Sequence, residues 1–90
     1  MHEASLVESL IDTAAEVSGG EPVVTVTVRR GAKCHVSIES LEAHFAALAP
    51  GTVVAGAALE VVEGPQGDGA RHDPYARDLL LVSLEVVGDS

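Results

Sequence analysis

Hydrophobic residues recur at helical spacing near the amino-terminal end of the chain. Between residues 5 and 18 they form one apolar stripe, which consists of Leu6, Val7, Leu10, Ile11, Ala14 and Val17. Ser5 and Glu8 have the spacing of a capping box, so the pattern predicts that the helix begins at Ser5 and leaves residues 1–3 outside it. The pair Gly19-Gly20 ends this predicted helix.

The rest of the chain alternates between strand and helix patterns. Valines and polar residues alternate over residues 23–30 and predict a strand. Ser37 is a good N-cap for a second helix that runs to about residue 49, with a buried stripe of Leu41, Phe45 and Leu48. Residues 58–63 predict a second strand. A third strand closes the chain, and its alternation places one apolar set on a single face, namely Leu80, Val82, Leu84 and Val86.

These elements together predict an α+β fold. The segment 64–75 is rich in Gly, Pro and Asp and is typical of an exposed loop. The element order is therefore helix, strand, helix, strand, strand. A strand-helix-strand unit suits a parallel crossover and a loop can join two antiparallel strands, so we expect two helices packed on a three-stranded mixed sheet. A chain of 90 residues supports one core, so we expect residues 1–90 to form a single domain.

Charge and composition exclude several classes of function. The formal net charge of −9 disfavours nucleic acid and anionic membranes as partners, because proteins bind both through clusters of Lys and Arg. The start of the chain lacks the basic residues of a signal peptide, and no apolar run is long enough to span a bilayer, so we expect a cytoplasmic protein. No nucleophile with an orienting base and no phosphate-binding glycine loop is present, which indicates that the protein is not an enzyme.

The first residues of the chain carry a candidate metal site. A free amino group at Met1, a backbone amide and the His2 imidazole can close two fused chelate rings that present three nitrogens near one plane. Nickel(II) and copper(II) favour such tetragonal nitrogen coordination. Three nitrogens leave a fourth position open, which suits a carrier. The alternative is a terminus whose imidazole simply points into water.

Three stretches of the chain resemble one protein family, the HypA nickel metallochaperones of hydrogenase and urease maturation. These stretches are "MHEASLVESL", "HVSIESLEAHFAALAPGTVVAGAALEVVE" and "LLLVSLEVV". The resemblance implies a three-stranded mixed sheet with two helices, and transient Ni(II) held by Met1 and His2 with Glu3 close by. It also implies a maturation GTPase and the precursor of the hydrogenase large subunit as partners, and it leaves homodimerisation open.

One departure from the family concerns zinc. Members usually carry two CxxC pairs between the last two strands, which form a zinc domain. Here residues 64–78 occupy that place and contain no cysteine, so we expect no structural zinc. Two functions therefore stay open. The first is a nickel-binding metallochaperone for maturation of a nickel enzyme. The alternative is a diverged, non-metal protein-interaction module of the maturation machinery.

Other candidate ligands are weaker. His44 lies at the edge of the apolar stripe of the second helix and is expected to be a hydrogen-bonded boundary residue. Cys34 and His35 are neighbours in a connector, and on an extended segment they would point in opposite directions, which argues against a reactive pair. His72, with Asp68 and Asp73 nearby, forms a loose group that is expected to have only weak metal affinity.

Overall fold

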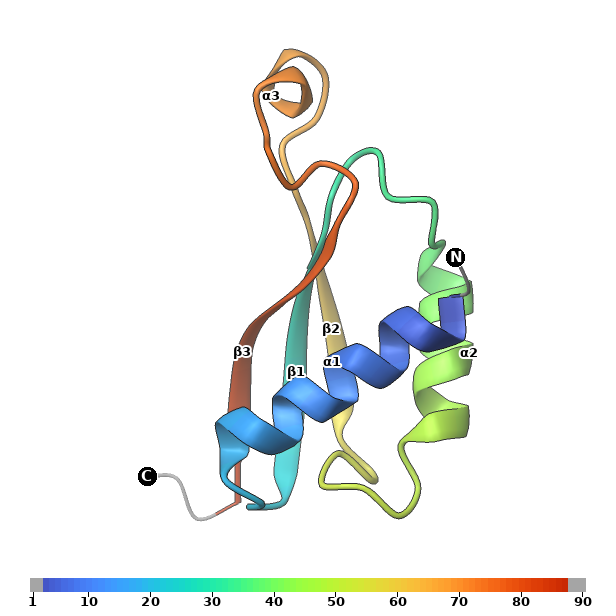
Figure 1. Ribbon diagram of the computed structural model, residues 1–90, viewed down its shortest axis with the longest axis vertical. Coiled ribbons are helices and arrows are strands. Elements are labelled where there is room, and N and C mark those ends of the chain that lie inside the picture. Colours follow the sequence, from blue (N-terminus) through green and yellow to red (C-terminus); the bar gives the residue numbers. More distant parts are fainter. Residues whose placement is uncertain (1–2, 88–90) are drawn as a thin grey trace.

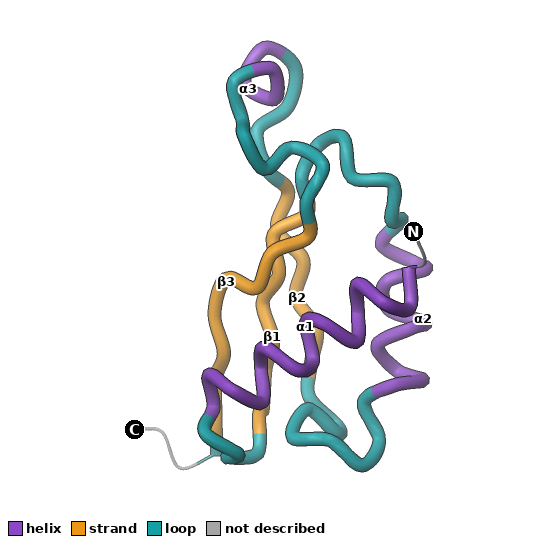
Figure 2. Tube along the Cα trace, in the orientation of Figure 1, coloured by secondary structure: helices purple, strands orange, loops and turns teal. Residues whose placement is uncertain are grey.

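The protein folds as an α+β domain in which a three-stranded sheet carries the helices. The computed structural model describes residues 3–87, with side chains from residue 4 onwards. Its elements, shown in Figure 2, are α1 (Glu3–Ser18), β1 (Val23–Arg30), α2 (Ile38–Leu48), β2 (Ala58–Glu63), α3 (Asp68–Arg71) and β3 (Leu79–Val86). The predicted fold class and order of elements are confirmed, with the short helix α3 as an addition. Within the described residues, no helix is both long and apolar enough to cross a membrane.

The sheet is mixed, as the sequence predicted. Its strand order is β2-β1-β3, with β1 in the centre. β1 pairs in parallel with β2, through partners such as Val26 and Leu59, and antiparallel with β3, through partners such as Val26 and Leu84. The segment between β1 and β2 contains α2, so the parallel pair is a strand-helix-strand crossover.

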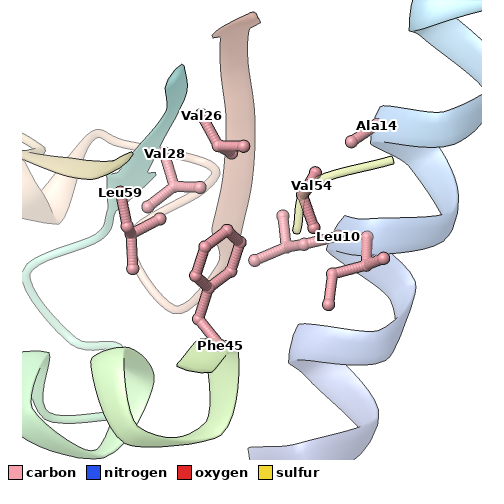
Figure 3. A pocket seen from close by; sticks show the side chains of 8 residues that line it. Leu10, Ala14, Val26, Val28, Phe45, Val54 and Leu59 are labelled. Carbon is pink, nitrogen blue, oxygen red and sulfur yellow. The ribbon is translucent and has the colours of Figure 1, made fainter. Parts of the chain in front are cut away.

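The core lies between one face of the sheet and the helices α1 and α2 (Figure 1). Leu10 of α1, Val28 of β1 and Phe45 of α2 point toward one another in Figure 3 and line the same apolar space. Leu41 and Val54 are fully buried. Each such side chain contributes about 1.5–3 kcal/mol when it leaves water. These contacts hold α1 and α2 in fixed positions on the sheet.

Two details of the predicted apolar stripes are wrong. Val17 is 66% exposed, because α1 contacts the core only as far as Ala14. In β3 the pairing shifts between Ser83 and Leu81, so Val82 has no partner on β1 and is 54% exposed. Because this bulge reverses the side-chain alternation, the core-facing residues of β3 are Leu79, Leu81, Leu84 and Val86 rather than the predicted set.

Candidate metal centre

The predicted metal ligands lie at the start of α1. Met1 and His2 fall outside the residues that the structure describes, and Glu3 is the first residue of α1. The prediction that the helix begins at Ser5 is therefore wrong by two residues, and Ser5 lies in the first turn rather than at the N-cap. Glu and Ala form helices well, and an acidic residue in the first turn interacts favourably with the positive end of the helix dipole. Both effects favour the earlier start.

The first turns of α1 are anchored by packing. Val7 is fully buried and Leu10 is 6% exposed, so the stripe of α1 reaches the core one turn after the helix begins. α1 also contacts α2, and Figure 1 shows the start of α1 on the side of the molecule where α2 lies. Glu3 thus belongs to a packed helix rather than to a free tail.

The other histidines differ in their surroundings. The Nδ1 atom of His44 lies 2.8 Å from the carbonyl oxygen of Ser40, one helical turn earlier, and the side chain is half-buried. This confirms the predicted boundary role. His72 is exposed at the end of α3. Among the side chains of residues 4–87, no three of His, Cys, Asp or Glu come together in a group that could hold a metal ion.

Asp73 is a structural anchor of the loop between β2 and β3. Its carboxylate is only 5% exposed and forms an ion pair with the guanidinium of Arg29 on β1. The backbone N–H of Tyr75 donates to Asp73 Oδ1 at 3.0 Å. The Tyr75 N–H and then the Arg29 guanidinium hold the pKa of Asp73 below its usual range. Asp73 therefore does not join the loose group with His72 that the sequence suggested.

The same loop is more ordered than its composition indicates. It contains α3, and both Ala70 and Ala76 are buried. The sequence signal for this order was Asp73 followed by Pro74, because an Asp side chain readily accepts a hydrogen bond from the backbone two residues later. The loop is therefore not a uniformly exposed segment.

Cys34 and His35 follow a turn rather than an extended segment. The N–H of Cys34 donates to the carbonyl of Gly31 at 3.0 Å, which closes a turn over residues 31–34. After this turn, Cys34 and His35 both line one surface hollow together with Lys33 and Arg77. Sequence reasoning did not predict this shared hollow, because it also needs Arg77, which lies more than forty residues further along the chain.

Comparison with known proteins decides the family. The family model described as "Hydrogenase/urease nickel incorporation, metallochaperone, hypA" matches residues 1–67. The chain belongs to the HypA family. This match covers α1, β1, α2 and β2 and ends inside the loop before α3, so it includes the first two of the three stretches of resemblance.

Individual HypA proteins agree with this assignment. The hydrogenase maturation factor HypA of Deinococcus radiodurans is 41% identical over 78 residues, which are 82% of this chain and 65% of that protein. HypA of Chlorobaculum tepidum is 40% identical over 73 residues, covering 77% of this chain and 63% of that protein. The chain thus spans about three fifths of the length of these relatives.

The fold also has a solved counterpart within the family. The solution structure of the Ni metallochaperone HypA from Helicobacter pylori superimposes with a TM-score of 0.75 at 19% identity, and the match covers 99% of this chain and 100% of that one. At this identity the likeness concerns the fold alone. It extends through β3, which the family model does not reach.

Proposed function

We propose that this HypA chain is a nickel-binding metallochaperone that serves maturation of a nickel enzyme, specifically a hydrogenase. The observation that carries the proposal is the family match over residues 1–67, because it includes the Met-His-Glu start as well as the elements that pack behind it. Nickel(II) is the cargo of such a protein and is held only transiently.

The ligands in this proposal are the amino group of Met1, a backbone nitrogen and the imidazole of His2, with Glu3 assisting. The start of α1 supports this assignment. The first N–H groups of an α-helix have no partner inside the helix, so a helix that begins at Glu3 leaves backbone nitrogens at its start uncommitted. Nitrogen donors in a plane suit nickel(II), and the open fourth position admits a ligand from the receiving protein.

The remaining parts of the proposal follow from the family. Residues 1–90 act as a single nickel-binding domain in which the loop 64–78 stands in place of a zinc domain, so no structural zinc is needed. The partners are a maturation GTPase and the precursor of the hydrogenase large subunit. Transfer of the ion to these partners, rather than catalysis, is the activity that we assign to the chain.

The test is a calorimetric titration of nickel into protein with its natural amino terminus. We expect His2→Ala to weaken binding by about tenfold or more, because it removes one of three nitrogens from the chelate. His72→Ala is the matched control, since it removes an exposed imidazole just after α3 and should leave the isotherm unchanged. A single residue added before Met1 converts the amine to an amide and should weaken binding as much as His2→Ala does.

The pH dependence gives a second readout. The amine and the imidazole must both lose protons to bind, so nickel affinity should fall below about pH 8 and more steeply below about pH 6.5. Identical isotherms for the wild type and His2→Ala would reject the carrier. In that case, capture of the maturation GTPase that survives both a chelator and His2→Ala would identify the chain as a protein-interaction module.

A further inference from the structure

A surface hollow lies between the β1–α2 connector and the segment that leads into β3. Its volume is about 400 Å³, and it is lined by Ala32, Lys33, Cys34, His35 and Arg77. Two of the five Lys and Arg residues of the chain therefore meet at one place. Because the formal net charge is −9, this hollow has the opposite charge to the protein as a whole.

The two cations at the hollow differ from the other three in their pairing. Arg29 pairs with Asp73, Arg30 lies 2.8 Å from Glu63, and Arg71 lies 3.8 Å from Asp68. Over the part of the chain that the structure describes, Lys33 and Arg77 are the Lys and Arg side chains that make no ion pair. Their charges are therefore available to a ligand.

The backbone holds these two residues in place. The N–H of Lys33 donates to the carbonyl of Ala76 at 2.7 Å, and the N–H of Gly31 donates to the carbonyl of Asp78 at 3.0 Å. The two segments approach so closely that a Cβ at Gly31 would lie 2.1 Å from the oxygen of Ala76. The positions from which Lys33 and Arg77 extend are thus fixed before any ligand arrives, which lowers the entropic cost of binding.

We propose that this hollow binds a phosphate-class oxyanion. The guanidinium of Arg77 can donate two parallel hydrogen bonds to such a group, the Lys33 ammonium supplies a second positive charge, and the His35 ring supplies an N–H donor. The same two charges repel a metal cation, so Cys34 and His35 do not act as a metal site here. No Phe, Tyr or Trp lines the hollow, so a nucleoside would find little stacking surface beyond the small imidazole of His35.

The proposal is tested by following the backbone amides of the full chain by NMR at constant ionic strength. The probes are inorganic phosphate, tripolyphosphate and ATP. We expect saturable shifts confined to residues 31–36 and 75–78, with tripolyphosphate and ATP bound equally within about twofold, because the phosphates alone are recognised. An ATP affinity far above that of tripolyphosphate would overturn this, since the nucleoside would then be the recognised part.

Substitutions make the test specific. Arg77→Gln should weaken tripolyphosphate binding by about fivefold or more, and Lys33→Gln should do likewise. Arg71→Gln is the matched control, because it makes the same charge change on the same loop but away from the hollow. Equal weakening by Arg71→Gln and Arg77→Gln, or shifts spread over the whole surface, would show that only the overall charge matters and would refute the site.

Discussion

The close approach of Gly31 to Ala76 can be tested by adding a single carbon atom. In Gly31→Ala the new Cβ would lie 2.1 Å from the Ala76 oxygen, 2.4 Å from the Ala76 carbonyl carbon and 2.5 Å from the Tyr75 oxygen. All three atoms belong to the backbone, so no side chain can rotate away. The two segments must separate by more than about 1 Å before the shortest of these contacts becomes an ordinary one.

That separation breaks the hydrogen bonds that join the segments. The Lys33–Ala76 bond of 2.7 Å and the Gly31–Asp78 bond of 3.0 Å would both be stretched or lost. At about 1 kcal/mol net for each bond, with strain added, we expect a loss of about 1–3 kcal/mol in the free energy of unfolding. For a domain of this size, the loss lowers the melting temperature by roughly 10 °C.

Thermal and urea denaturation followed by circular dichroism would measure this change. Gly69→Ala is the control, because it adds the same carbon to the same loop inside α3, where alanine is favoured and where the nearest atom, the Pro65 Cβ at 3.0 Å, has to move by only a few tenths of an ångström. A loss below about 0.5 kcal/mol for Gly31→Ala, or an equal loss for Gly69→Ala, would refute the reasoning.

Two further predictions concern stability. Leu41→Ala empties a fully buried position on α2 and should lower the free energy of unfolding, measured by urea denaturation, by about 2–5 kcal/mol. Ile38 on the same helix is 39% exposed, so Ile38→Ala should lower it by less than about 1 kcal/mol. Similar losses for the two variants would contradict the assignment of the core. The pKa of Asp73 is lowered in the folded state, so its ion pair with Arg29 stabilises the fold at pH values above the unfolded-state pKa of about 4. This contribution disappears as the pH falls through the lower pKa of the folded state. Melting curves of the wild type and Asp73→Asn should therefore differ at pH 7 and converge below about pH 4, and a constant difference would rule this out.

Local patterns predicted most of the fold. The strand Val23–Arg30 has the bounds that its alternation indicated, and Ser37 caps α2 by accepting a hydrogen bond from the N–H of Ser40 at 3.0 Å. The bulge at Val82 could not be predicted in the same way. It depends on how β3 pairs with β1, and the sequence of β3 alone does not determine which residues of β1 it pairs with.

The candidate site was predictable only in part. The Met-His-Glu start predicts a nickel(II) or copper(II) chelate because its donors are neighbours in the chain, and this stays a prediction, since Met1 and His2 lie outside the described residues. The hollow beside Lys33 depends instead on Arg77, more than forty residues away, and on a backbone contact at Gly31. Neither residue is unusual in its own local sequence, so only the folded chain brings them together.

The loop between β2 and β3 divides into a base and a tip. The base, residues 73–78, is bonded to the end of β1 and the connector that follows it. In the tip, the hydrogen bonds are local, as from the N–H of Ala70 to the carbonyl of Gly67, and the tip joins the base through the N–H of Asp73, which donates to the carbonyl of Ala70 at 3.3 Å. A cysteine-bearing module could therefore be grafted between residues 65 and 72 without loosening the rest of the fold.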